Sequence, residues 1–580
     1  MNRLISLIGS CDLSDVTSLR KLSASEGGNK YNFDDDSDDG VTIECNDTHK
    51  DTPEFVKFTI GFPFDTLGIS ASNNRQLDIM TADYGLRQFA EQVEGIYIEK
   101  GHKTGKEKFT GKIFIYKPAQ KIIMRNSSYI MNNILYLSLI IRFPVMMASK
   151  RNVVAGKLSV RIVQKDLARA IRKFIHSFDI EDYEIKARVY IRQQEIRNIL
   201  SDKGLVSFIA NGSILPRNDC GLALDGAVPF ISPPEDEIEI HFIDGLILRG
   251  MGVKEGVTVI TGGGYSGKST LLDGMLHGIY DHIPGDGREY CITQERSCKI
   301  IAEDGRSITS LDISPFISDM GSLKTKNFTT QHASGSTSQA ANIMEAISFG
   351  CNALLIDEDR TATNFMIRDA RMKKIIKDDP IVPFTDRVRQ IYKDTGISTI
   401  LVIGGSSEYL DLADNVYLMK DFVINNYTIE VAKTKQNTFD FFAVNDNKPI
   451  KWRLEKTLSK KSMSSLKKDE TNRIREFLSI TDDEILIGVY KSNISRLDTI
   501  ISVQQMTAIA FIIRYLFNTQ KADKYCLLHE ITNIYNEIKQ KGLESIYSNK
   551  FGIDFNMELP AMHDILFTLS RMPNFVYIRD

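Results

Sequence analysis

Residues 256 to 270 read Gly-Val-Thr-Val-Ile-Thr-Gly-Gly-Gly-Tyr-Ser-Gly-Lys-Ser-Thr, a run in which glycines follow a short β-branched segment. The β-branched run at 257–260 predicts a buried strand, and the residues from 270 onward suit a helix. Between the two, the pattern Gly-x-x-x-x-Gly-Lys-Ser extends from Gly262 to Ser269. This order of strand, glycine-rich loop and helix is typical of a phosphate-binding P-loop.

Each residue type in this loop suits the binding of a nucleotide. Glycines allow successive backbone N–H groups to point at phosphate oxygens, and the N-terminus of the following helix adds positive charge. Lys268 can reach the β and γ phosphates, and the Ser269 hydroxyl can bind Mg²⁺. We therefore expect ATP and Mg²⁺ as cofactors. The predicted nucleotide-binding residues are Gly262, Gly263, Gly264, Tyr265, Ser266, Gly267, Lys268, Ser269 and Thr270.

A second apolar strand ends in three carboxylates, in the sequence Asn-Ala-Leu-Leu-Ile-Asp-Glu-Asp at 352–359. The surrounding chain, from 243 to about 435, alternates strands with helices and predicts an α/β unit. Ligands bind at the carboxyl ends of such strands. We therefore expect Asp357 to hold the Mg²⁺ as a Walker B aspartate and Glu358 to polarise the attacking water. Helix capping is the alternative role for these carboxylates.

A serine-glycine helix start lies at 333–347. Ser334 precedes Asp357 by 23 positions, the offset at which ABC-type ATPases place a Ser-Gly-Gly helix start. In that class, such a start offers a hydroxyl, backbone amides and a helix N-terminus to ATP bound on another ATPase unit. The predicted signature residues, acting in trans, are Ser334, Gly335 and Ser336. An ordinary capped helix is the alternative. The chain has one such set and no internal repeat, so we expect a homodimer with two composite sites.

Composition limits the class of protein. The 580 residues are 42% hydrophobic and 25% charged, as in globular chains of several domains. The net charge of −3 disfavours a wholesale polyanion binder, although local patches can differ. Seven scattered cysteines without a Cys-x-x-Cys motif predict reduced thiols. Polar residues interrupt the most apolar stretch, 129–148, so we expect no membrane span and a cytoplasmic location.

Changes of pattern along the chain predict three domains. Residues 1–240 combine strand-like and helical segments and predict an α+β N-terminal domain. Residues 241–440 form the predicted α/β domain with the P-loop, and Pro233-Pro234 lies close to its start. Residues 441–580 comprise a linker and a small, mainly helical C-terminal domain, because apolar stripes recur at helical spacing.

Two basic stretches, 100–125 and 150–173, lie in the N-terminal domain. They predict an electrostatic surface for nucleic acid, with RNA as the partner. The residues that we single out are Lys106, Lys108, Lys112, Arg169 and Arg172. A solvated hairpin and helix face is the alternative. The only tryptophan, Trp452, belongs either to a solvated linker or to a stacking platform for RNA.

Eight further strings occur in a fixed order along the chain. They are Phe-Ile-Ala-Asn-Gly-Ser-Ile-Leu-Pro-Arg at 208–217, Gly-Met-Gly-Val at 250–253, Gly-Asp-Gly-Arg-Glu at 285–289, Ala-Glu-Asp-Gly-Arg at 302–306, Asp-Ile-Ser-Pro-Phe-Ile at 312–317, Ala-Ser-Gly-Ser-Thr-Ser-Gln-Ala-Ala-Asn at 333–342, Thr-Asn-Phe-Met-Ile-Arg-Asp at 363–369 and Gly-Gly-Ser at 404–406. With them the chain resembles the predicted ATPases of the ABC class, a soluble family related to a kinetoplastid mitochondrial RNA-editing accessory protein. The resemblance covers nearly the whole chain and is most specific from 205 to 420. It implies an α+β N-terminal domain, an ABC-type ATPase core, a small C-terminal domain, ATP hydrolysis, dimer formation and RNA binding.

The chain departs from the family pattern at three places: Ser266 replaces a histidine, Arg360 replaces a threonine, and Ser407-Glu408 replaces a Gly-Asp pair. Arg360 could lower the pKa of Glu358 or pair with Asp359, and either contact would affect the hydrolysis rate.

Two elements of ABC-type sites have no clear counterpart. Gly404-Gly405 stands where ABC transporters carry a histidine after the fourth strand. Gln294 is a candidate for the Mg²⁺-sensing glutamine, but it follows Lys268 by only about 26 positions, which is a short spacing. Arg288 and Arg306 follow Asp-Gly turns and are either turn residues or nucleotide contacts.

Together these features predict a Mg²⁺-dependent ABC-class ATPase that acts as a homodimer on a partner such as RNA. Glu358 and Lys268 are the predicted catalytic residues. The alternative is an ATP-binding switch or scaffold that hydrolyses ATP slowly or not at all. The fused domains disfavour the ATPase half of a transporter, and we find no lid or acceptor site for a small-molecule kinase.

Overall fold

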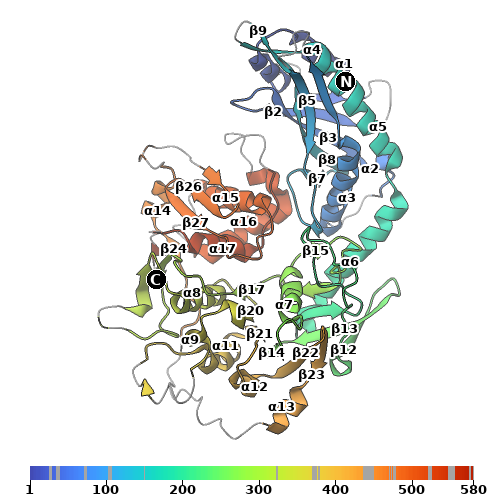
Figure 1. The fold of residues 1–580 in the computed structure, drawn as a ribbon. Helices are drawn as coiled ribbons and strands as arrows, with labels where there is room; N and C mark the ends of the chain where they lie inside the picture. The colour runs from blue at the N-terminus through green and yellow to red at the C-terminus, as the bar shows by residue number, and fades with distance from the viewer. Residues whose placement is uncertain are drawn as a thin grey trace. The chain divides into compact units, whose positions relative to one another are not determined.

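The computed structural model describes most of the chain (Figure 1). The residues outside the description are 25–28, 34–39, 71–74, 102–107, 149–150, 320, 322–323, 369–374, 377–378, 435–449, 469–470, 472, 474–477, 520–525, 547–555, 574–576 and 579–580. The chain forms two compact units. The first comprises residues 1–191 and 538–559, and the second comprises residues 192–537 and 560–580.

An antiparallel sheet forms the centre of the first unit. Its strand order is β1 (Lys30–Asn32), β2 (Thr42–Thr48), β3 (Phe55–Pro63), β8 (Ile134–Arg142), β5 (Lys108–Ile115) and β4 (Tyr97–Gly101), with β7 (Ser128–Met131) beside β8. A separate hairpin pairs β9 (Val145–Ala148) with β10 (Arg151–Val154). Strand β3 is buried along almost its whole length, because both of its faces are covered. The β-branched and aromatic residues of the segment suit such a central strand.

Helices cover this sheet. Helix α3 (Arg75–Val93) packs on β7 and β8, and α5 (Ala168–Ser177) packs on α3. Phe62, Phe89 and Phe174 meet there, with ring centroids 4.8–5.7 Å apart. Other helices of this unit are α1 (Asn2–Ser10), α2 (Phe64–Leu67) and α4 (Gly156–Arg161). Helix α6 (Ile180–Asp202) begins in the first unit and continues into the second at residue 192. A π-helical turn, η2 (Ile162–Leu167), joins α4 to α5.

The second unit contains a mainly parallel sheet. Its strand order is β17 (Ser297–Ile300), β20 (Ala353–Asp357), β21 (Ser398–Val402), β14 (Val257–Gly262), β22 (Asn415–Lys420) and β23 (Val423–Asn426). All neighbours are parallel except the β22–β23 hairpin. Strands β20 and β21 are buried at every position, as expected for apolar strands covered on both faces.

A smaller antiparallel sheet and several helices pack around the parallel sheet. The smaller sheet has the order β12 (Glu237–His241), β13 (Ile247–Lys254), β11 (Leu205–Ala210) and β16 (Cys291–Thr293). One apolar core joins the two sheets through α7 (Lys268–His277). The other elements are α8 (Gly335–Ser348), α9 (Thr363–Met366), α11 (Val388–Thr395), α12 (Glu408–Leu412), α13 (Thr428–Thr434) and the hairpin β18 (Ile308–Leu311) and β19 (Phe328–Thr330).

The C-terminal region is mainly helical, as predicted. Its helices are α14 (Lys460–Ser465), α15 (Val503–Asn518), α16 (Leu527–Lys541) and α17 (Met562–Ser570). A three-stranded sheet, β25 (Leu478–Ile480), β26 (Glu484–Ile487) and β27 (Tyr490–Asn493), accompanies them. Helix α15 packs on α17, β25 and β26. The predicted α/β fold with a helical C-terminal region is confirmed.

Two sequence expectations concern the chain as a whole. A disulfide joins Cys298 to Cys351, so the expectation that all cysteines are reduced thiols is wrong for this pair. The neighbouring strands β17 and β20 bring the two residues together, and no spacing motif signals such a contact. Among the described helices, none has the length and apolar character that crossing a bilayer requires.

Candidate nucleotide site

The P-loop connects β14 to α7, as the sequence predicts. Its first and last glycines, Gly262 and Gly267, have φ of 149° and 97°, a region that favours glycine. A Cβ atom on Gly262 would collide with the carbonyl oxygen of Met419 in β22. The loop therefore needs glycine at Gly262 for close packing against a neighbouring strand, as well as for its curvature.

Lys268 is positioned over this loop. Its Nζ donates hydrogen bonds to the carbonyl oxygens of Gly262 and Gly263, at 2.8 and 2.7 Å. The first turn of α7 holds the lysine, and the curled loop turns these two carbonyls toward it. The ammonium group is thus fixed at the place where a P-loop binds phosphate.

Ser269 and Asp357 border one cavity of about 550 Å³, which we call the P-loop cavity. Ser269 lies in the first turn of α7, and Asp357 is the buried last residue of β20. A hydroxyl and a carboxylate are hard oxygen ligands that suit Mg²⁺, which takes its other ligands from water and phosphate oxygens. No group of three or more His, Cys, Asp or Glu side chains able to hold a metal occurs among the described residues. The donor set therefore fits Mg²⁺ bound together with a nucleotide.

The carboxylate of Glu358 is held by the segment that follows β21. Its Oε2 accepts a hydrogen bond of 2.7 Å from the backbone N–H of Gly404. Its Oε1 accepts a hydrogen bond from the hydroxyl of Ser406. The Gly-Gly-Ser segment thus stands where the sequence lacks the expected histidine. Sequence reasoning missed Ser406 as a functional candidate, although the string at 404–406 contained it.

Arg360 has a different partner from the two that we considered. Its guanidinium pairs with Asp498 at 3.3 Å, and its side chain is 54% exposed. Asp498 also pairs with Lys299 of β17. The structure records no ion pair between Arg360 and Asp359 or Glu358 within the described residues. Asp498 lies about 140 positions further along the chain, which explains why no local pattern revealed the contact.

The predicted signature residues form the exposed start of α8. Ser334 is the N-cap, and its hydroxyl contacts the Thr337 hydroxyl at 3.0 Å. Ser334 is exposed, and Gly335 and Ser336 are half-buried. The cavity that holds Ser269 and Asp357 does not include them. In one chain the structure therefore separates the signature residues from the P-loop cavity.

A buried polar network anchors α8. Arg306 donates to Asn342 and Glu345 of this helix. Glu303 binds Arg571 in two hydrogen bonds of 2.5 and 3.2 Å. Burial opposes ionisation of Glu303, but Arg571 and Arg306 outweigh it and lower the pKa of this carboxyl to about 2. Arg306 is therefore a structural residue of the helix support.

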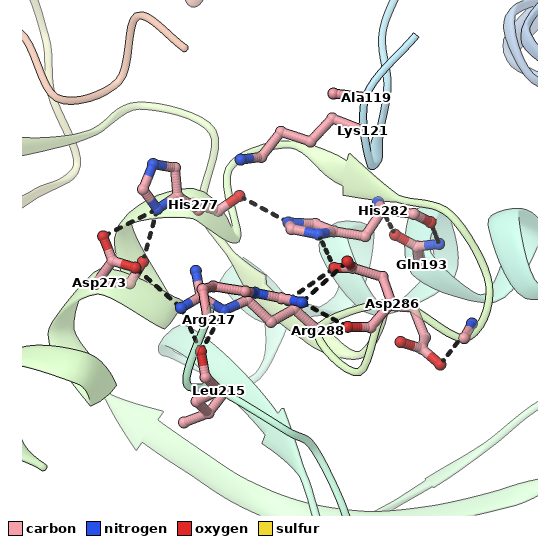
Figure 2. A network of polar contacts seen from close by, with 12 residues as sticks. Ala119, Lys121, Gln193, Leu215, Arg217, Asp273, His277, His282, Asp286 and Arg288 are labelled. Carbon is pink, nitrogen blue, oxygen red and sulfur yellow. Dashed lines mark hydrogen bonds and ion pairs between the residues drawn. The ribbon is translucent and has the colours of Figure 1, made fainter. Parts of the chain in front are cut away.

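Arg288, the other arginine of an Asp-Gly-Arg turn, borders the P-loop cavity. It donates to the Leu215 carbonyl at 2.8 Å and to Asp273 of α7 at 2.9 Å, as Figure 2 shows. Burial again opposes ionisation, but His277 and Arg288 hold the pKa of Asp273 well below its usual range. Arg288 thus supports the helix that begins at the P-loop.

A second ion pair lies beside this contact. Arg217 binds Asp286 in a two-pronged contact, at 2.8 and 3.0 Å, and Asp286 also contacts His282 (Figure 2). Arg217 also borders the P-loop cavity. The strings 208–217 and 285–289 therefore meet at α7.

Strand register locates the segment beside Asp357. Ile300 of β17 pairs with Ile356, so the residues after Ile300 lie next to the Walker B carboxylates. Gln294 precedes β17 and lies toward the opposite end of the strand. It is buried and donates to the Leu205 carbonyl at 2.9 Å. The structure thus gives Gln294 no contact with the P-loop cavity.

The predicted nucleic-acid residues have different environments. Lys112 is exposed in β5, with Nζ 4.9 Å from the ring centroid of Phe114. Arg169 and Arg172 are exposed on α5. Lys106 lies outside the described residues, and only the backbone of Lys108 is described.

Two other residues of this hypothesis are not accessible. Arg125 is buried and pairs with Asp83 and Glu558, so it belongs to the core of the first unit. Trp452 is also buried, and its Nε1 donates to Asp394 at 3.0 Å. A buried indole cannot serve as a stacking platform for RNA.

Comparisons with known families agree with this site. A family model for the ABC_ATPase P-loop domain matches residues 179–451, and a model for the MRB1590 C-terminal domain matches residues 479–576. The part of the chain around the P-loop therefore has the fold of an ABC-type P-loop ATPase domain, and the C-terminal part is similar to the MRB1590 C-terminal domain. The resemblance to ABC-class ATPases is thereby confirmed.

One curated protein and two solved structures are similar to this chain. The uncharacterized protein MJ1628 of Methanocaldococcus jannaschii is 30% identical over 289 residues, covering 47% of this chain and 63% of that protein. The cbiO1 structure of Clostridium perfringens, part of the ABC transporter complex cbiONQ, is 15% identical. It covers 38% of this chain and 87% of that one, with a TM-score of 0.23. MJ1267, an ATP-binding cassette of an ABC transporter in its ADP conformation, is 15% identical, with coverages of 36% and 97% and a TM-score of 0.23.

Proposed function

We propose that this chain hydrolyses ATP with Mg²⁺. The arrangement of Glu358 carries the proposal, because two donors from residues 404–406 hold the carboxylate of this residue, which directly follows Asp357 at the end of β20. Lys268 and the loop amides bind the phosphates, Ser269 and Asp357 hold the metal, and Mg²⁺ neutralises phosphate charge when bound. Glu358 accepts the proton of the attacking water.

The test compares the wild-type chain with Glu358→Gln in steady-state hydrolysis and in ATP binding. A general base contributes roughly 10²–10⁴-fold to a rate, so we expect hydrolysis to fall by that factor while ATP binding persists. Lys268→Ala should instead weaken ATP binding. Equal, very slow hydrolysis by wild type and Glu358→Gln with tight ATP binding would support the alternative, an ATP-binding switch or scaffold.

The proposal includes a homodimer in which Ser334, Gly335 and Ser336 of one chain complete the site of the other. The exposed position of Ser334 at the start of α8, apart from the P-loop cavity, supports this arrangement. A mixing experiment tests it directly. Chains with Lys268→Ala and chains with Ser334→Arg should each be inactive alone. A mixed dimer retains one intact composite site, so mixing should restore about a quarter of wild-type activity. Activity that stays absent after subunit exchange contradicts the composite site.

RNA is the partner that we propose, acting in the cytoplasm. Four basic residues at intervals of four support it, and all are exposed: Lys157, Arg161, Lys165 and Arg169. They lie along the continuous helical segment α4–η2–α5. A helical rise of about 1.5 Å per residue spaces neighbouring members of the row by roughly 6 Å. Such a row suits contacts with successive phosphates.

Filter binding of single-stranded RNA at increasing salt tests this surface. Each phosphate contact contributes about −0.7 to the slope of log K against log salt for single strands. Reversal of Lys165 and Arg169, two neighbours in this row, to glutamate should therefore reduce the slope by about 1.4. Lys203→Glu, an exposed lysine outside this row, is the matched control. Unchanged binding after the double reversal, or an equal loss in the control, would refute the assignment.

A further inference from the structure

Two exposed aromatic residues have unusual backbone conformations, one within the P-loop and one in a turn beside it. Tyr265, at the tip of the loop, has φ of 58° and a fully exposed side chain. Phe422, in the turn between β22 and β23, has φ of 65° and is 56% exposed. Left-handed backbone is uncommon for bulky residues, and exposed aromatic rings add no core packing. Neither the fold of the loop nor the core therefore accounts for these two side chains.

The turn of Phe422 lies directly against the loop. A Cβ atom on Gly267 would be 3.2 Å from Cδ1 of Phe422 and 3.3 Å from Cε of Met419. Asp421, which precedes Phe422, also has positive φ, at 50°. Two-residue hairpin turns of this kind favour Asn-Gly or Asp-Gly. The chain keeps the aspartate but places a phenylalanine where glycine would be free of strain.

The sheet order says which part of a nucleotide lies near this turn. The strand β20, with Asp357 at its end, lies on one side of β14, beyond β21. The strand β22 is the neighbour of β14 on the other side. A nucleotide whose metal lies at Asp357 and whose nucleoside extends away from β20 would bring its base over the carboxyl end of β22. Ligands of parallel sheets bind at such strand ends, and Phe422 follows this one.

We propose that Phe422 and Tyr265 are the aromatic contacts for the purine base of the bound nucleotide. A purine overlaps an aromatic ring over a larger area than a pyrimidine does, so the difference in stacking strength favours purines. Strained backbone persists where function requires it. Stacking on the base is the function that explains the strained conformations of these two residues. The inference rests on the proposed ATP binding, and it assigns these two side chains the choice of base.

The experiment measures binding of ATP, CTP and inorganic tripolyphosphate, each with Mg²⁺, to the full chain. The variants are Phe422→Gly and Tyr265→Gly, which remove the ring and relieve the left-handed strain. We expect each to weaken ATP binding about tenfold, the effect of losing one base–aromatic stack. Binding of tripolyphosphate should stay unchanged, and the melting temperature should stay the same or rise. Phe422→Trp keeps an aromatic ring and should retain ATP binding. Met131→Ala, at an exposed apolar residue of β7, should leave ATP binding unchanged.

Four results overturn the inference. Unchanged ATP affinity in both glycine variants would show that neither ring contacts the base. An equal loss of ATP and tripolyphosphate binding shows that the substitutions act on the loop and not on the base. A loss of dimer formation with intact ATP affinity shows that the rings contact another chain. A wild-type chain that binds neither ATP nor tripolyphosphate overturns the proposed function as well, so the two failures are distinguishable.

Discussion

The carboxylate of Glu358 accepts a hydrogen bond of 2.7 Å from the backbone N–H of Gly404. This contact joins the end of β20 to the segment after β21, where no histidine is present. A backbone donor and the neighbouring Ser406 hydroxyl thus orient the predicted base. Each of the two carboxylate oxygens therefore has one donor that fixes its position.

Ser406→Ala removes one of the two donors to Glu358. Because the backbone donor remains, we expect a partial effect, with kcat about tenfold lower and KM unchanged, as for a residue that orients a base. Steady-state hydrolysis with Mg²⁺ is the measurement. Ser407→Ala is the matched control, because Ser407 is adjacent and exposed. Ser406→Thr should retain most of the rate, and an unaffected kcat in Ser406→Ala would mean that the hydroxyl plays no role.

Arg571→Met breaks the buried pair with Glu303. Removal of one partner leaves a buried charge, so we expect the free energy of unfolding to fall by roughly 3–5 kcal/mol. Urea titration measures the loss. Adding Glu303→Gln should recover part of it, whereas strictly additive losses would argue against a direct interaction.

The same pair makes stability dependent on pH. The pKa of Glu303 is lowered in the fold to about 2, from about 4.5. Its contribution is therefore fully present above about pH 4.5 and is lost as the pH falls toward 2. Thermal melts across this interval should show a steeper acid loss for the wild type than for Glu303→Gln.

Asp564→Asn tests a shift in the opposite direction. Burial raises the pKa of Asp564 to about 7, while the Thr499 hydroxyl donates to the carboxyl at 2.5 Å. The folded state then binds more protons than the unfolded state between pH 3.8 and 7, so stability falls as the pH rises through this window. We expect the variant to gain melting temperature over the wild type at pH 8 but not at pH 4. Asp482→Asn, at an exposed position, should show no such difference.

The disulfide between Cys298 and Cys351 predicts a specific peptide pair. Digestion without reductant, followed by mass spectrometry, should recover the two cysteines in one cross-linked product. Because the bond closes a loop of 53 positions, Cys351→Ser should cost roughly 2–4 kcal/mol of stability under oxidising conditions. Alkylation of both thiols in urea without reductant would contradict the bond.

The local pattern was sufficient to predict much of the fold. The run 257–260 and the run before Asp357 are apolar, and both became buried parallel strands. A short continuous run of β-branched and apolar residues is typical of a strand that is covered on both faces in a parallel sheet. The disulfide escaped prediction, because the strand order that brings Cys298 to Cys351 depends on which strands pair.

The same distinction applies to the candidate site. Residues 262–269 could be recognised from sequence, because the loop binds phosphate through consecutive backbone groups and one lysine. Ser406, Asp498 and Phe422 could not be assigned, because each reaches the site from a distant segment. Likewise, Arg125 and Trp452 read as basic and aromatic surface candidates, and only their burial reassigned them.

The P-loop, the acidic strand end and the helix start at 334–336 could be located from the sequence, since each of these is a contiguous run whose chemistry depends on neighbours in the chain. The tertiary structure alone decided what surrounds the P-loop. It placed Gly404 and Ser406 on Glu358, Asp498 on Arg360, and Phe422 against Gly267. These contacts depend on the order of the parallel strands, since that order decides which loops share the carboxyl edge of the sheet. The loop at 262–269 could thus be identified from the sequence, whereas the residues that contact it depend on the order of strands in the sheet.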